Sequence, residues 1–171
     1  DKMAVRREIL LQRLRGSNNS PLSPEDIEYL ISNMVKSDKD LLINGKWKFK
    51  LYDHDQGSVG GQVLDLDPKI PYLIGVDPAA GGGGDNTAIV VINPYNLKIA
   101  AEFKNPYISG TDVLRVLNAL ITEYMPNAVL TIEKNSLGVV IIDMICESPG
   151  ISSNLYWSEN AASNQLENLT I

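Results

Sequence analysis

Short apolar runs, each bounded by turn residues, constrain the fold of this chain more than any other feature of its sequence. From residue 71 onward, such runs alternate with stretches of helical periodicity. The pattern predicts strands over residues 72–77, 87–92, 98–103, 128–133 and 154–157, and helices over 111–125 and 137–147. Only short turns separate the first three strands, so we expect an antiparallel meander followed by helical crossovers. The sequence therefore predicts an α/β fold with a mixed sheet in the order β-β-β-α-β-α-β, flanked by helices.

The residues ahead of this core contain helical and extended segments. Apolar residues at helical spacing predict helices over 3–15 and 24–36. Strict alternation predicts a short strand over 46–51, which we assign to the connection into the core. The domain organisation that we expect is a helical arm and connection over 1–70, a core over 71–157 and an incomplete tail over 158–171.

Composition narrows the classes of protein to which the chain can belong. Its 171 residues fit one ordinary domain, or a small domain with an arm, and are enough to bury a core. The single Cys146 and the single His54 exclude a disulfide framework, cysteine-built zinc sites and paired-histidine metal sites. No apolar run reaches the roughly 20 residues of a membrane helix, so we expect no membrane partner.

Charge is distributed unevenly along the chain, which carries a net charge of −6. Residues 1–50 hold 10 basic and 7 acidic residues, whereas residues 51–171 hold 5 basic and 14 acidic ones. A simple nucleic-acid binder draws its affinity from Lys and Arg that neutralise phosphates, and an acidic body lacks them. Carboxylates collect divalent cations, although solubility alone also accounts for a net negative charge.

Two carboxylates occupy equivalent places at the ends of two predicted strands. Asp77 closes the strand over 72–77, and Glu133 closes the strand over 128–133. If these strands are neighbours, the two side chains lie roughly 5 Å apart and repel each other unless a proton or a cation lies between them. Mg²⁺ or Mn²⁺ suits such oxygen ligands, and two such ions can drive phosphodiester hydrolysis. Asp85, which follows a turn of four glycines, can lean over the same site.

Each of these features also has an ordinary structural explanation. An Asp before Pro is often a turn residue, and a run of glycines often forms a flexible hairpin. A glycine-rich turn can instead cradle a nucleotide phosphate, but this turn lacks the Lys-Ser/Thr of a P-loop and runs into a strand. Lys134 and Asn135, which follow Glu133, are placed to touch a phosphate or to orient a ligand.

Three segments, taken together, resemble a known family. Residues 75–79 (Gly-Val-Asp-Pro-Ala), followed by the glycine turn and Asp85, resemble the opening of a ribonuclease H-like nuclease core. Residues 132–138 (Ile-Glu-Lys-Asn-Ser-Leu-Gly) resemble the second acidic motif of the nuclease domain in phage large terminase subunits. Residues 7–26 are similar to the segment that joins the terminase ATPase to its nuclease. The resemblance covers roughly residues 5–157.

The resemblance implies a metal-dependent endonuclease that cuts concatemeric viral DNA during genome packaging in the host-cell cytoplasm. By this resemblance, Asp77 and Glu133 are catalytic ligands of Mg²⁺ or Mn²⁺, and Asp85 matches an additional catalytic acid. The implied partners are double-stranded DNA, the terminase ATPase domain, the small terminase subunit and the portal protein.

The chain departs from the family pattern in two respects. In the family, a third metal-binding Asp lies further along the chain, on or before a C-terminal helix. It has no counterpart here, because no Asp follows Asp143, which lies inside a predicted helix. The chain also lacks a P-loop, so the resemblance implies a fragment of a larger protein. Two alternatives stay open: a nucleotide-phosphate-binding domain of the actin and sugar-kinase type, and a non-catalytic module that docks packaging partners.

Overall fold

The chain divides into two units, residues 1–36 and residues 37–171. The computed structural model describes residues 24–37, 39–52, 57–59, 62–64 and 66–156. The first unit contains the helix α2 (Pro24–Ser32), which lies within the segment predicted as helical. The helix predicted over 3–15, His54 and the tail over 158–171 lie outside the described residues.

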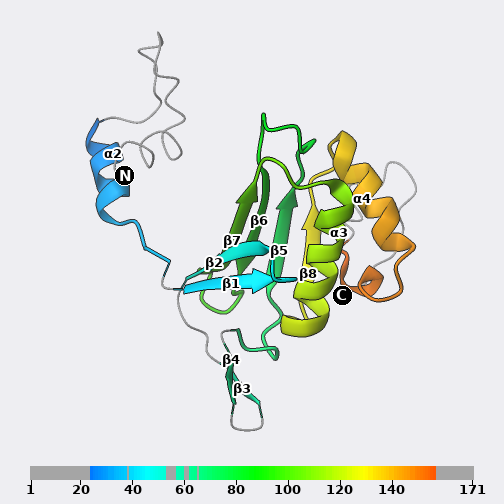
Figure 1. Cartoon of the computed structure of the whole chain (residues 1–171). Helices are drawn as coiled ribbons and strands as arrows, with labels where there is room; N and C mark the ends of the chain where they lie inside the picture. The colour runs from blue at the N-terminus through cyan, green and yellow to red at the C-terminus, as the bar shows by residue number, and fades with distance from the viewer. Residues whose placement is uncertain (1–23, 38, 53–56, 60–61, 65, 157–171) are drawn as a thin grey trace. The chain divides into compact units, whose positions relative to one another are not determined.

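A mixed sheet of six strands forms the centre of the second unit (Figure 1). The strands lie in the order β1-β2-β7-β6-β5-β8, and all neighbours pair antiparallel except β5 and β8, which are parallel. Their bounds are β1 (Lys39–Ile43), β2 (Trp47–Leu51), β5 (Leu73–Asp77), β6 (Thr87–Ile92), β7 (Ile99–Asn105) and β8 (Val129–Ile132). A separate antiparallel pair consists of β3 (Gly57–Val59) and β4 (Gln62–Leu64).

The predicted meander is present, because β5, β6 and β7 are consecutive antiparallel neighbours. The assignment of residues 46–51 to the connection was wrong, since β2 pairs with β7 in the main sheet. Burial explains this placement: Phe49 is fully buried and stacks on Phe103, with ring centroids 5.0 Å apart. The strand predicted over 154–157 is reduced to a single parallel bridge between Leu130 and Leu155.

The two faces of the sheet have different surroundings. The inner face carries buried side chains from five strands: Phe49, Phe103, Ile89, Ile74 and Leu130. These pack with buried residues of α3 (Gly110–Ala119) and of the π-helical turn Leu120–Tyr124 that continues it. On the outer face, the register aligns Lys50, Glu102, Val90, Gly75 and Thr131 across the strands. None of these five outer residues is fully buried.

Two helical segments follow the parallel crossover and stand beside the sheet. The helix α4 (Ser136–Cys146) follows β8, and Leu137 near its start contacts Gly110 at the start of α3. Beyond α4, the 3₁₀ turn Ser152–Asn154 leads the chain back along β8. There the side-chain amide of Asn154 donates to the backbone oxygens of Pro126 and Ala128. Within the described residues, no helix has both the length and the apolar character needed to cross a membrane.

Leu117→Ala tests the packing of α3 on the sheet. Leu117 is fully buried in the core, so its truncation leaves a cavity and should lower the free energy of unfolding by about 2–5 kcal/mol. Leu97→Ala is the matched control, because the Leu97 side chain is 79% exposed. Urea denaturation measures both values, and an equal loss in the two variants would contradict this description of the core.

Candidate functional site

The parallel pairing of β5 and β8 brings two predicted carboxylates to one edge of the sheet. Val76 stands opposite Ile132 in the last pair of the register between β5 and β8. The Glu133 amide then donates to the Val76 carbonyl oxygen at 2.8 Å, so the ladder continues one residue beyond β8. Asp77 and Glu133 therefore follow as the next opposed residues, and both are exposed. The expectation that their strands are neighbours is confirmed.

Asp77 makes the ionisation of Glu133 less favourable. The pKa of Glu133 is raised from its ordinary value, first by a side-chain hydrogen bond with Asp77, next by the negative charge of Asp77, and last by desolvation. Two carboxylates in contact are stable only when a proton or a cation lies between them. The pair therefore offers adjacent hard oxygen donors, which is the ligand chemistry that Mg²⁺ and Mn²⁺ prefer.

Asn135 connects the ends of the two strands. Its side-chain oxygen accepts a hydrogen bond from the Gly138 amide at 2.9 Å and so caps the start of α4. Its amide nitrogen donates to the Pro78 carbonyl oxygen at 2.8 Å and to Asp77 Oδ1 at 3.4 Å. The Asn135 side chain thus binds Asp77 and Pro78 at the end of β5 as well as the first turn of α4.

Gly138 makes the turn from β8 into α4 possible. A Cβ atom at this position would lie 1.9 Å from the carbonyl oxygen of Glu133. Any larger residue must therefore displace the backbone that carries the Glu133 side chain. Sequence reasoning did not single out this requirement, because it depends on the close approach of the strand end to the helix.

The glycine loop after β5 is anchored at several points. The buried Thr87 hydroxyl accepts from the Ala79 amide at 2.9 Å and closes the base of the loop. Gly83 donates its amide to the Pro106 carbonyl oxygen at 2.9 Å. At Gly81, whose φ is +73°, a Cβ would lie 2.7 Å from the backbone oxygen of Ile108. These contacts distinguish the loop from the flexible hairpin that a run of glycines alone indicates.

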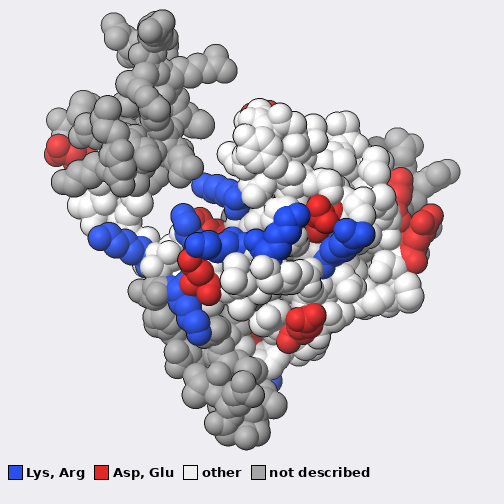
Figure 2. Space-filling model, in the orientation of Figure 1, with Lys and Arg blue, Asp and Glu red and all other residues white. Residues whose placement is uncertain are grey.

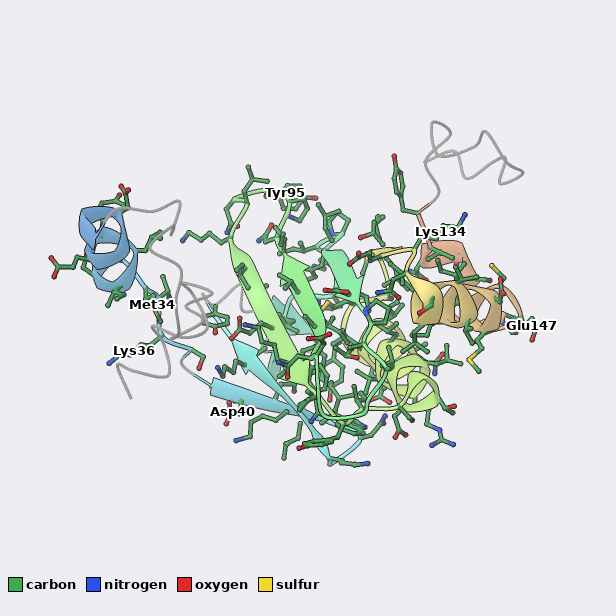
Figure 3. The ribbon with its side chains drawn as sticks, turned by 90° about the horizontal axis from the view of Figure 1, so that it is seen from above. Met34, Lys36, Asp40, Tyr95, Lys134 and Glu147 are labelled. Atoms are coloured by element: carbon green, nitrogen blue, oxygen red, sulfur yellow. The ribbon has the colours of Figure 1, made fainter. Side chains whose placement is uncertain are left out.

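The remaining acidic candidates form no three-residue cluster with the carboxylate pair among the residues that the structure describes. Asp85 is exposed in the glycine loop, and the described part of the chain contains no cluster of three or more His, Cys, Asp or Glu side chains able to hold a metal ion. Asp143 is exposed along α4. Lys134 is exposed next to Glu133, and Figure 3 shows it at the opposite end of α4 from Glu147. The structure thus brings together Asp77 and Glu133, with Asn135 beside them.

Comparisons with known proteins add no assignment to this geometry. No family model matches the chain, and no curated protein matches it. Its function is therefore argued from the residues of the site.

Gly138→Ala tests the contact between α4 and the end of β8. The added methyl group overlaps the Glu133 carbonyl oxygen, so the free energy of unfolding should fall by about 1–3 kcal/mol despite the better helix propensity of Ala. Gly82→Ala is the control, because a Cβ at Gly82 meets nothing within 4 Å. Urea denaturation should separate the two variants, and equal stability would contradict the crowding at Gly138.

Glu133→Gln tests the repulsion between the two carboxylates. An acid whose pKa is raised in the folded state binds its proton more tightly there, so its stabilising contribution is complete at low pH and is lost as the pH rises through the folded pKa. In EDTA, we therefore expect Glu133→Gln to melt at a higher temperature than the unaltered protein at neutral pH. The difference should vanish well below pH 4.5, the ordinary Glu value.

The control for this pH series is Glu123→Gln, which alters an exposed glutamate of the π-helical turn. Thermal unfolding should show no comparable pH-dependent gain for this variant. If Glu133→Gln and the unaltered protein melted together across the whole series, the carboxylates would not be in contact.

Proposed function

We propose that the chain contains a metal-dependent DNA endonuclease domain of the ribonuclease H-like type, from a viral DNA-packaging terminase. The observation that carries the proposal is the contact between Asp77 and Glu133 at the ends of the parallel strands β5 and β8. A surface that needs only solubility has no reason to hold two carboxylates together, because their repulsion opposes folding at neutral pH.

The strand order supports the ribonuclease H-like assignment. The meander β7-β6-β5 is extended by the parallel strand β8, and Leu155 lies alongside β8 in a further parallel bridge. An antiparallel meander followed by parallel crossovers is the order that the resemblance implies. The residues of both resembling motifs, 75–79 and 132–138, meet at one edge of this sheet.

The residues of the site have separate roles in the proposed reaction. Asp77 and Glu133 hold a divalent cation through their carboxylate oxygens. A bound divalent ion supplies an activated water and neutralises charge on the phosphodiester. Lys134, exposed beside Glu133, provides a positive charge for a phosphate oxygen.

Basic side chains on β2 and its preceding turn provide a surface for the DNA backbone. Lys46, Lys48 and Lys50 are all exposed, and Figure 2 shows Lys and Arg gathered over β1 and β2. Acidic partners offset part of this charge, since Lys48 pairs with Asp40 at 2.8 Å and Lys50 with Glu102 at 3.4 Å. Contacts of this kind bind phosphates without reading the base sequence, so the proposed cleavage has no sequence preference.

The wider setting follows from the same proposal. A terminase nuclease acts on concatemeric DNA in the host-cell cytoplasm, together with a terminase ATPase domain, a small terminase subunit and a portal protein. These partners supply the DNA and the motor, while the second unit of this chain supplies the carboxylate pair.

Supercoiled-plasmid cleavage tests the proposal. We expect nicking in Mn²⁺ that EDTA abolishes and that both Asp77→Asn and Glu133→Gln reduce to background, because each removes a cation ligand while keeping the shape of the side chain. Asp143→Asn is the control, since Asp143 is exposed along α4 away from the pair. Binding of Mn²⁺ without nicking would contradict the endonuclease and favour a docking module.

A further inference from the structure

The cap of α4 differs in chemistry from the cap of α3. At α3, the Ser109 hydroxyl accepts from the Asp112 amide at 3.2 Å and donates to the Asp112 carboxylate at 3.1 Å, so its bonds stay within the first turn. At α4, Asn135 accepts from the Gly138 amide in the same way, but its amide group reaches across to β5. Ser, Thr, Asp and Asn cap helices about equally well, so capping alone does not require Asn here.

Only an amide side chain of this length performs all three contacts. The acceptor oxygen serves the helix, and the two N–H groups serve the Pro78 carbonyl and the Asp77 carboxylate. A Ser at this position keeps the acceptor but cannot reach β5, and an Asp keeps the acceptor but has no donor when ionised. The side chain therefore fixes the distance between the end of β5 and the start of α4.

We propose that Asn135 is a positioning residue, which holds the Asp77 carboxylate beside Glu133 in the geometry that receives a divalent cation. The inference rests on the proposed function. Hydrogen bonds from outside the ligand shell orient metal-binding carboxylates, and their loss typically weakens metal affinity or activity roughly 10- to 100-fold. Asn135 reaches Asp77 from α4, and Glu133 is held by its own backbone bond to β5, so the pair is fixed from two directions.

Asn135→Ser separates the positioning role from the capping role. It retains a good N-cap for α4 and removes both donors to β5. Ser109→Ala is the matched control, because it removes the cap of the neighbouring α3 and leaves Asp77 untouched. If Asn135 only stabilised the fold, Asn135→Ser would lower the melting temperature and, like the control, leave the Mn²⁺ affinity unchanged.

Isothermal titration with Mn²⁺ gives the first readout, and plasmid nicking over a series of Mn²⁺ concentrations gives the second. We expect Asn135→Ser to raise the Mn²⁺ dissociation constant roughly 10- to 100-fold, and to raise the Mn²⁺ concentration for half-maximal nicking by the same factor. Ser109→Ala should leave both values unchanged. Equal Mn²⁺ affinity in Asn135→Ser and the unaltered protein would overturn the inference.

A readout without metal distinguishes failure of the inference from failure of the proposed function. The side-chain carboxyl ¹³C resonance of Asp77, recorded in EDTA at one fixed pH, should move in Asn135→Ser and stay in place in Ser109→Ala. If the unaltered protein bound no Mn²⁺ but this resonance moved, the proposed function would fail and the positioning contact would stand. A resonance that did not move would overturn the positioning role, whatever the protein binds.

Discussion

The parallel pairing of β5 with β8 is the constraint on which the rest of this structure depends. The meander leaves β5 with one open side, and the crossover through α3 returns the chain to that side in the same direction. Strands that run in the same direction end at the same edge of a sheet. Asp77 and Glu133 therefore meet. An antiparallel β8 would place the same two residues at opposite ends of the sheet.

Contacts around the two strand ends fix the backbone of Glu133 and the side chain of Asp77. Repulsion between like charges is ordinarily relieved by rotation or by movement of a loop. Here the Glu133 backbone is bonded to β5, and Gly138 lies so close to its carbonyl oxygen that no Cβ fits between them. The Asp77 carboxylate is held by Asn135 from α4. A cation bound between the two carboxylates would relieve the repulsion that raises the pKa of Glu133.

Local periodicity predicted the central strands well, because their apolar residues alternate or run without interruption between clear turns. The bounds of β6 agree with the predicted 87–92. Periodicity failed where burial depends on distant partners. The strand β1 was not predicted, since of its side chains Ile43 alone is fully buried. The alternation of 46–51 was recognised, but its membership of the main sheet depends on Phe103, which is remote in the sequence.

The same distinction applies to the site. Strand-end positions were enough to pair Asp77 with Glu133, because the register of neighbouring strands follows from where each strand ends. The role of Asn135 depends on its contact with Pro78, which is 57 residues away in the sequence, and no local pattern specifies that contact. From the sequence, Asn135 was expected only to touch a phosphate or to orient a ligand beside Glu133, and neither its cap of α4 nor its bond to β5 was predicted.

The character of the site also bears on the choice between the proposed endonuclease and a docking module. A docking surface gains nothing from two carboxylates whose contact opposes folding at neutral pH, because a single charge attracts a basic partner as well. A cation site gains directly, since each carboxylate supplies a ligand and the repulsion between them favours binding. The backbone register places the two carboxylates at opposed positions, and Asp77 raises the pKa of Glu133 through a side-chain hydrogen bond and through its charge. The repulsion between Asp77 and Glu133 therefore favours a cation-binding site over a docking surface.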